Sequence, residues 1–241
     1  MILSNKFELC NKIGQGNFGK VYRAVNVRTQ EEVAIKIEPF ESSSLKNEAR
    51  VLHYMQGITG FPALKWFGAF KREFHYLVLP LLGESLADLH ATVPEMPMHV
   101  VVPLGKQMFQ RIKDLHGKGL LHRDIKPENF LLDCQRTTLY LIDFGFCKRY
   151  TDDQGKHIEC RQINRMVGTP KFVSKNVLLR GMEPSRRDDV ESIVNVLLYL
   201  HGDNDHEIFT QLLEDIRELS FEEEPAYDVY IQFLDTYQRA G

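Results

Sequence analysis

The stretch that decides the fold is His122-Arg123-Asp124-Ile125-Lys126-Pro127-Glu128-Asn129, and Asp143-Phe144-Gly145 begins nineteen residues after Asp124. Asp124 offers a carboxylate that can engage the proton of a hydroxyl group. Asn129 and Asp143 offer amide and carboxylate oxygens, which are ligand types that Mg²⁺ accepts from proteins. The stretch therefore predicts a catalytic loop that holds metal ions close to a proton acceptor.

A glycine-rich turn lies upstream, in Gly14-Gln15-Gly16-Asn17-Phe18-Gly19. Because glycine lacks a Cβ atom, the backbone N–H groups of such a turn can approach phosphates closely. The pattern also occurs in dinucleotide-binding folds, where a helix follows the third glycine, and in ordinary hairpin turns. Here a strand-like run, 20–25, follows instead and includes Val21. We therefore favour a phosphate cover formed by Gly14, Gly16 and Gly19, with an ordinary hairpin as the alternative.

A strand lysine and a helix glutamate form the next candidate pair. Lys36 ends the run Val33-Ala34-Ile35-Lys36, whose alternation places its side chain on the same face as Ala34, beneath the glycine turn. The lysine could then reach the α and β phosphates of a nucleotide, and Glu48 follows at a distance that permits an ion pair. Glu41 is a less well-placed competitor, and Glu38 points to the same strand face. We expect the Lys36–Glu48 pair to orient the lysine.

The ordered set from Gly14 to Asp143 predicts phosphoryl transfer from ATP with Mg²⁺. Asp124 would orient the attacking hydroxyl, and Lys126 would steady the transferred group. Asn129 and Asp143 would hold two Mg²⁺ ions. Each residue alone could be a helix cap or turn former, but the whole set is hard to explain in that way. Lys126 and Thr169 resemble the serine/threonine branch of the protein kinase superfamily.

Composition bounds the class of protein. The chain has 241 residues, of which 43% are hydrophobic and 26% charged, enough to bury one sizeable core. The formal charge of −3 and the lack of a polybasic run argue against nucleic-acid and membrane-surface binding. The cysteines show no paired spacing, the first residues lack a leader pattern, and no apolar run approaches the roughly 18 residues of a membrane span. We expect a soluble monomer in the cytoplasm, the nucleus or both.

Periodicity predicts an α+β fold in a single domain, 1–241, with an N-lobe at 1–79 and a C-lobe at 84–241. The resemblance to protein kinases implies that the connection at 80–83 is a hinge. Alternating patterns predict strands in an N-lobe sheet, and Ser42, Ser43 and Ser44 offer hydroxyls to cap one helix that ends at Gly57. The strands are expected within 21–25, 32–37 and 76–79.

We expect the C-lobe to be mainly helical. One helix is expected to begin at Pro103 and to end at Gly117, a buried central helix spans 188–200, and another ends near Glu218. Near the carboxyl end an aromatic stripe falls at helical intervals and is expected to face the core. Its members are Tyr227, Tyr230, Leu234 and Tyr237.

Four further motifs closely resemble the casein kinase 1 family, from about Phe7 to Gly202 and again from Leu219 to Arg239. Ser174-Lys175-Asn176 also stands where other protein kinases have Ala-Pro-Glu. The resemblance implies a bilobal protein-kinase fold and a constitutively active serine/threonine kinase whose substrates carry acidic or phosphorylated residues. The four motifs are Gly57-Ile58-Thr59-Gly60-Phe61-Pro62, Leu81-Leu82-Gly83-Glu84-Ser85-Leu86-Ala87-Asp88-Leu89, Glu128-Asn129-Phe130-Leu131-Leu132 and Ser185-Arg186-Arg187-Asp188-Asp189-Val190-Glu191-Ser192.

The same resemblance implies roles for single residues. Leu79 would be the gatekeeper, Leu82 would bind adenine through its backbone, and Asp189 would be a buried anchor at the start of the central helix. Pro80 replaces a hinge glutamate, and the adenine bond there uses a carbonyl that proline retains. The remaining ATP-binding side chains would be Ile13, Val21 and Ala34.

Substrate selection is where the chain departs from the family. Lys171 occupies the position of an anion-binding arginine and would be supplemented by Arg161 and Arg165, although a solvated surface charge is about as good an interpretation of Lys171. The stretch between Gly202 and Leu219 is short, so part of the anion site and a basic run are missing. A long regulatory tail is also missing, and we expect no tail-based autoinhibition. An ATP-binding scaffold with weak transfer is the alternative function.

Overall fold

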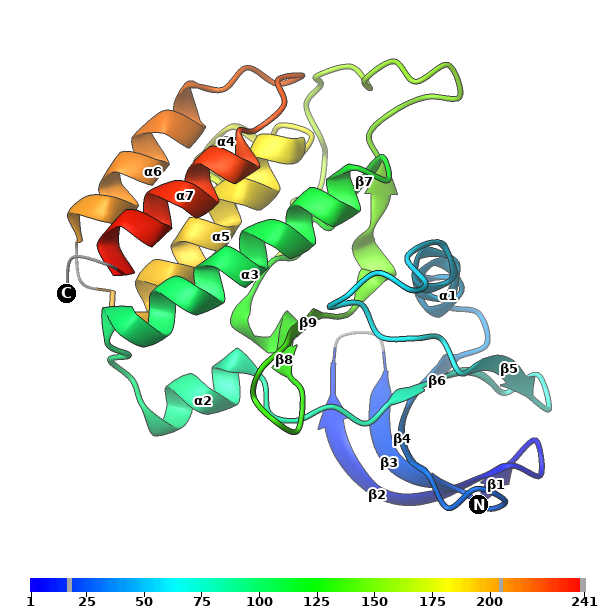
Figure 1. Cartoon of the computed structure of the whole chain (residues 1–241). Coiled ribbons are helices and arrows are strands. Elements are labelled where there is room, and N and C mark those ends of the chain that lie inside the picture. The colour runs from blue at the N-terminus through cyan, green and yellow to red at the C-terminus, as the bar shows by residue number, and fades with distance from the viewer. Residues whose placement is uncertain (17–18, 204–205, 239–241) are drawn as a thin grey trace. The chain divides into compact units, whose positions relative to one another are not determined.

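The computed structural model describes residues 1–16, 19–203 and 206–238, and the chain forms two compact units (Figure 1). The first unit comprises Met1–Gly83 together with Ile142–Gly145. The second comprises Glu84–Leu141 and Phe146–Gly241. Within the described ranges, no helix combines the length and apolar character needed to cross a bilayer.

The first unit is built on an antiparallel sheet in the order β1-β2-β3-β4-β6-β5. Hydrophobic side chains from alternate strand positions form the core under it, among them Leu3, Phe7, Ile35 and Val78. The three expected strands are confirmed as parts of β3, β4 and β6. The strands are β1 (Ile2–Leu3), β2 (Phe7–Gln15), β3 (Lys20–Asn26), β4 (Glu32–Pro39), β5 (Trp66–Phe70) and β6 (Phe74–Pro80).

One helix, α1 (Ser44–Tyr54), follows β4, and its beginning differs from the expectation. Ser43 is the N-cap residue, but its side chain makes no capping hydrogen bond. The hydroxyls of Ser42 and Ser44 instead donate to the Glu38 carboxylate, which also accepts the Leu45 backbone N–H at 3.2 Å. A carboxylate from β4 thus satisfies the helix start, because a negative charge there offsets the unpaired N–H groups.

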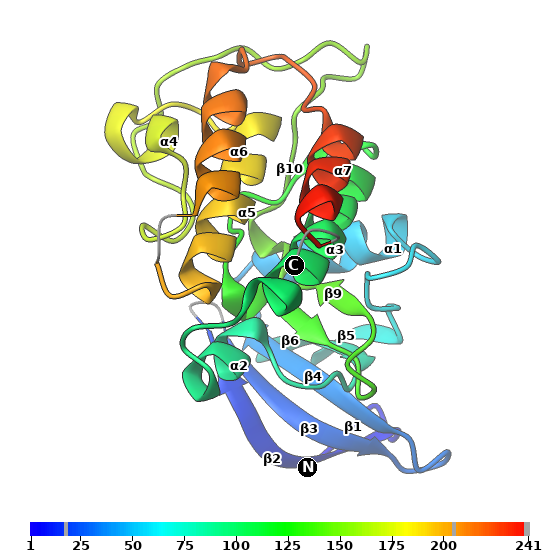
Figure 2. The ribbon, with the colours of Figure 1, turned by 60° about the vertical axis from the view of Figure 1, so that its left-hand side comes forward.

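The second unit is mainly helical. Helix α5 contacts both α3 and α6, and α7 packs along α3 (Figures 1 and 2). Two short antiparallel pairs, β7 with β10 and β8 with β9, carry the loops of the candidate site. The helices are α2 (Leu86–Thr92), α3 (Met98–His116), α4 (Lys175–Arg180), α5 (Arg186–Leu200), α6 (Glu207–Glu218) and α7 (Tyr227–Gln238). The remaining elements are β7 (Leu120–Leu121), η1 (Pro127–Asn129), β8 (Phe130–Leu132), β9 (Leu139–Leu141), η2 (Phe144–Phe146) and β10 (Lys148–Arg149).

The hydrophobic patterns of the second unit mark its core correctly. The central helix is confirmed as α5, where Val190, Ile193 and Leu197 are fully buried. The aromatic stripe lies on α7, and its members Tyr227, Tyr230 and Leu234 are buried. Its last member, Tyr237, lies outside the residues whose side chains the structure describes, as do Asn204, Asp205 and Arg239.

The expected start of α3 at Pro103 is wrong. The helix begins at Met98, so that Pro103 lies inside it. A proline at this position removes one backbone hydrogen bond, which normally disfavours a helix interior. Val101 and Val102, both buried, extend the apolar face toward the N-terminus and hold the first turns in place.

Candidate active site

In the first unit, an ion-pair cluster forms around Lys36 on β4. The Lys36 ammonium lies 2.7 Å from Glu48 Oε2 on α1 and 2.7 Å from Asp143 Oδ1. Glu38 Oε1 lies farther away, at 3.8 Å. The sequence-based pairing of Lys36 with Glu48 over Glu41 and Glu38 is therefore correct in geometry, and Asp143 is a second partner.

The charges in this cluster are unequal. Burial lowers the pKa of Lys36, but the charges of Glu48 and Asp143 outweigh burial and raise this pKa above its ordinary value. Burial raises the pKa of Glu48, and Asp143 adds to the shift while Lys36 opposes it. One ammonium thus faces three carboxylates, counting Glu38. A divalent cation bound to Asp143 would offset the excess negative charge, so the donor set fits Mg²⁺.

The glycine-rich turn joins β2 to β3. Gly16 N–H donates to the Gly19 carbonyl at 2.9 Å, and a Cβ atom on Gly19 would lie 2.0 Å from the Ile37 carbonyl oxygen. Asn17 and Phe18 lie outside the described residues. Because a strand rather than a helix follows Gly19, the dinucleotide-binding interpretation is excluded for this turn.

The expected nucleotide-binding side chains share one face of the sheet. Val21 is the direct cross-strand partner of Lys36, and Ala34 is the partner of Leu79. Directly opposed residues point to the same face, as do alternate residues of one strand such as Ala34 and Lys36. Ile13, at the end of β2, is 47% exposed, and Leu82 follows β6 in the segment that ends this unit. The sheet register therefore places Val21, Ala34, Lys36 and Leu79 on a common surface.

In the second unit, the predicted catalytic loop, 122–129, centres on Asp124, which is 4% exposed. Its Oδ1 accepts a hydrogen bond from the Thr169 hydroxyl at 2.7 Å, and its Oδ2 accepts one from Lys126 Nζ at 2.7 Å. Asn129 Nδ2 donates to the Asp124 carbonyl at 2.8 Å, which leaves Asn129 Oδ1 as the oxygen suited to a metal ion. The structure thus brings Asp124, Lys126 and Asn129 together and adds Thr169.

Asp189, at the start of α5, holds the backbone of this loop. Its carboxylate accepts the N–H groups of His122 at 2.7 Å and Arg123 at 2.8 Å. Arg123 has a φ of 69°, a left-handed conformation that costs free energy in any residue with a side chain. These hydrogen bonds offset that cost, and the buried anchor expected at Asp189 is present.

His116 completes this anchor from the end of α3. Its Nε2 lies 3.0 Å from Asp189 Oδ2, and its Nδ1 lies 2.7 Å from the Tyr227 hydroxyl. Burial lowers the pKa of His116 despite the nearby carboxylate. Burial opposes ionisation of Asp189, but hydrogen bonds from His116 and the loop backbone hold the pKa of Asp189 below its ordinary value. This combination assigns a neutral imidazole that donates to Asp189 and accepts from Tyr227.

A second buried carboxylate, Glu183, collects basic side chains from the loop at 122–129 and from the segment after Asp143. Lys148 Nζ lies 2.7 Å from it, Arg161 Nε 3.2 Å and Arg123 Nη1 3.8 Å. Although burial opposes ionisation, these cations lower the pKa of Glu183 below its ordinary value. The carboxylate links the catalytic loop to the segment that carries Thr169. Sequence reasoning missed Glu183, because its partners lie 22 to 60 residues away and no local pattern connects them.

Two residues of Ser174-Lys175-Asn176 hold the start of α4 in place. Ser174 caps α4 by accepting the Val177 N–H at 3.2 Å, and its hydroxyl donates to Asp188 Oδ1 at 2.5 Å. The Lys175 N–H donates to Glu191, which also binds Arg217 at 2.9 Å. The segment is thereby tied to α5 and α6.

The expected anion-binding residues have different partners. Lys171 Nζ lies 3.3 Å from Asp203 Oδ2 and 4.0 Å from the centre of the Tyr199 ring. Arg161 is bound to Glu183, whereas Arg165 is exposed. No contact joins these three cations among the described residues, and the acidic partner of Lys171 had no signal in the sequence.

The sequence matches the family model described as protein kinase domain over residues 7–219. The antiparallel sheet of the first unit and the helices of the second fit a protein kinase fold. Because the match covers far more than half of the 241 residues, the chain belongs to the protein kinase domain family.

Proposed function

We propose that this chain is an active serine/threonine protein kinase of casein kinase 1 type. It would transfer the γ-phosphoryl group of ATP to serine or threonine near acidic or phosphorylated residues. The observation that carries this proposal is the Asp124 carboxylate, held between Thr169 and Lys126. A buried carboxylate with fixed donors on both oxygens is poised to orient an attacking hydroxyl.

Each residue has a definite task in this proposal. Lys36, oriented by Glu48, would bind the α and β phosphates, and Lys126 would steady the transferred group. Asn129 Oδ1 and the Asp143 carboxylate would hold Mg²⁺, which supplies positive charge for the oxygens of the transferred phosphoryl group. Adenine would lie on the sheet face shared by Val21, Ala34 and Leu79.

The proposal includes activity without prior phosphorylation. Many protein kinases need a phosphate to neutralise the arginine of the catalytic loop. Here Glu183 already gathers Arg123, Lys148 and Arg161. A carboxylate built into the chain would therefore do what a phosphate does elsewhere.

Incubation of the purified protein with Mg-ATP and an acidic, serine-containing protein tests the proposal. We expect phosphate on serine or threonine, and loss of at least about a hundredfold in rate for Asp124→Asn, which removes the proton acceptor. Treatment with a phosphatase beforehand should leave the rate unchanged. Incorporation no greater than that of the Asp124→Asn control would contradict the proposal.

The alternative is an ATP-binding scaffold with weak transfer, which the pairing of Lys171 with Asp203 favours. Under both functions Mg-ATP should raise the unfolding temperature, because a ligand that binds only the folded state stabilises it. A clear stabilisation by nucleotide combined with negligible turnover on acidic, primed and neutral peptides would support the scaffold.

A further inference from the structure

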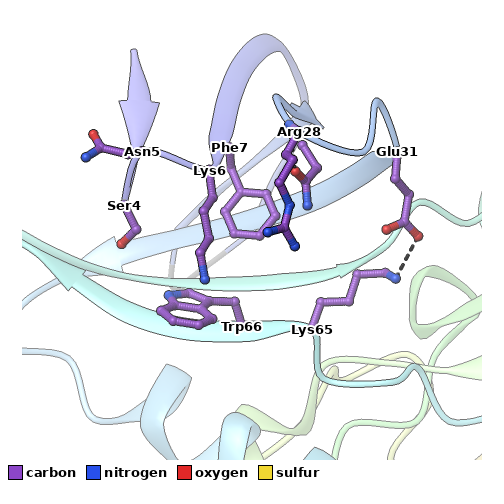
Figure 3. Close-up of a pocket in the computed structure, with 9 residues that line it drawn as sticks. Ser4, Asn5, Lys6, Phe7, Arg28, Glu31, Lys65 and Trp66 are labelled. Atoms are coloured by element: carbon purple, nitrogen blue, oxygen red, sulfur yellow. Dashed lines mark hydrogen bonds and ion pairs between the residues drawn. The ribbon is translucent and has the colours of Figure 1, made fainter.

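A pocket lies in the first unit, at the turns of the sheet (Figure 3). Its lining comes from the β1–β2 turn, the β3–β4 turn and the start of β5. It encloses about 490 Å³, a volume within the range of sites that bind ligands. The lining residues are Ser4, Asn5, Lys6, Phe7, Asn26, Arg28, Glu31, Lys65 and Trp66.

The pocket is positively charged although the whole chain has a net charge of −3. Three cationic side chains line it, and Glu31 is its one carboxylate. Glu31 is already bound to Lys65 at 2.7 Å. In the described part of the chain, Lys6 and Arg28 have no acidic partner. Lys6 instead lies over the Trp66 ring (Figure 3), with its amine 4.0 Å from the ring centre.

The two turns that carry Lys6 and Arg28 are held in place before any ligand binds. Asn26 Oδ1 accepts the backbone N–H groups of Arg28 at 3.1 Å and Thr29 at 3.3 Å, which fixes the β3–β4 turn. The Lys6 carbonyl accepts the Val27 N–H at 2.8 Å, so the two turns are joined. Turns that are fixed beforehand lose little backbone freedom when a ligand binds to the side chains they carry.

We propose that this pocket binds an acidic segment of a partner protein. The cations come from three separate segments, and Lys6 and Lys65 are each held by a different neighbour, Trp66 and Glu31. Several carboxylates along one polypeptide match that arrangement better than a single phosphate does. The amide groups of Asn5 and the Nδ2 group of Asn26 can bind the peptide backbone.

Trp66 makes the proposal directly measurable, because it is the only tryptophan of the chain and is 38% exposed. We expect its fluorescence to change saturably when a ten-residue peptide rich in glutamate is added, because the peptide draws Lys6 away from the indole. The matched peptide with glutamine in place of glutamate should leave the emission unchanged. Raising the salt concentration should weaken binding.

Calorimetry on variants tests the residues. Lys6→Glu with Arg28→Glu should weaken binding of the acidic peptide by roughly tenfold or more, because two attractions become repulsions. Lys6→Gln with Arg28→Gln should give a smaller loss, and Arg50→Glu, an exposed charge reversal on α1, should give none. Thermal unfolding of each variant verifies that it folds.

Three outcomes would overturn the proposal: no binding by the wild-type protein, equal affinity in the charge-reversed variant, or binding of inorganic phosphate or a single-stranded oligonucleotide as tight as that of the peptide. The titration needs neither nucleotide nor phosphoryl transfer. Its failure is therefore distinguishable from a failure of the proposed kinase activity.

Discussion

In the second unit, single carboxylates determine which basic side chains are held in ion pairs. Glu183 is 3% exposed and binds Lys148 and Arg161, whereas Asp203 is exposed and pairs with Lys171. A buried carboxylate with several charged partners is costly to replace, while an exposed ion pair contributes little to stability. The two acids should therefore respond differently to substitution.

Glu183→Gln should reduce both stability and turnover. The amide keeps the shape of the carboxylate but leaves the surrounding cations without a negative partner, so we expect a loss of about 1 to 3 kcal/mol in the free energy of unfolding. We also expect a several-fold fall in kcat with little change in the KM for ATP. Urea unfolding and steady-state kinetics measure these effects, and Glu159→Gln, an exposed change, is the matched control. Unaltered kcat in Glu183→Gln would show that the carboxylate has no part in the active arrangement.

Asp203→Asn should leave the free energy of unfolding nearly unchanged and lower the KM for acidic substrates. Removing the partner frees the Lys171 ammonium, and the KM for an acidic peptide should fall by about two- to fivefold, the range expected for an exposed pair. The KM for a neutral peptide of the same length should not change. An equal fall for both peptides, or persistence of the effect in a Lys171→Gln background, would speak against this use of Lys171.

At the scale of elements, the start of α1 depends on a residue of the preceding strand. Glu38 accepts hydrogen bonds from two serine hydroxyls and from the Leu45 N–H. Helix α1 also carries Glu48, the partner of Lys36. The orientation of the lysine and the stability of the helix start are thus coupled through β4.

Glu38→Ala should destabilise the first unit by about 1 to 2 kcal/mol, because it leaves these donors without an acceptor. The KM for ATP should rise as well, because Glu48 loses its fixed position. Urea unfolding and nucleotide titration check both effects against Glu41→Ala, an exposed change in the loop that follows β4. Loss of stability without any change in nucleotide affinity would indicate that Glu48 is held independently of the helix start.

Elements with a strong repeat could be predicted from sequence, and elements defined by distant partners could not. Strands β3, β4 and β6 and helix α5 follow clear patterns of burial. The two-residue strands β7 and β10 form only because they pair with each other, which no local pattern records. The predicted start of α3 at Pro103 was wrong, because burial of the neighbouring valines outweighed the preference of proline for the first turn of a helix.

In the candidate site, too, contacts between residues close in sequence could be predicted, and contacts with distant partners could not. The Lys36–Glu48 ion pair could be predicted from the sequence, and Asp124 and Asn129 were expected in one loop, because only 12 and 5 residues separate the partners. The partners Glu183 and Asp203 could not, because each meets its cations only after the helices have packed.

For the molecule as a whole, the buried His116 predicts a loss of stability in mild acid. The pKa of His116 is lowered in the folded state, so below its ordinary value near 6.5 the unfolded chain binds a proton that the folded chain excludes. Stability should therefore fall as the pH decreases from about 6.5. The titratable and charged groups near this ring are Asp189, Tyr227, Tyr150, Arg186 and His122.

Urea unfolding at pH 7.5, 6.5 and 5.5 measures this slope. We expect His116→Gln to be less stable at pH 7.5 but to lose less stability on acidification, whereas His53→Gln, an exposed change, should behave like the wild type. An identical slope in wild type and His116→Gln would contradict the prediction. A further decline near pH 4 should follow from Asp189 and Glu183, whose lowered pKa values make their stabilisation disappear as they are protonated.

The hydrogen bonds of Asp189 also determine when the loop at 122–129 can fold during synthesis of the chain. It holds the N–H groups of His122 and Arg123, which precede it by 67 and 66 residues. At synthesis rates of about 5 to 20 residues per second, roughly 3 to 13 seconds separate the appearance of the loop from that of its anchor. During that interval the hydrogen bonds from Asp189 that offset the left-handed backbone of Arg123 cannot form. The loop at 122–129 therefore cannot acquire its final geometry until the chain has been made as far as Asp189, long after the loop itself has appeared.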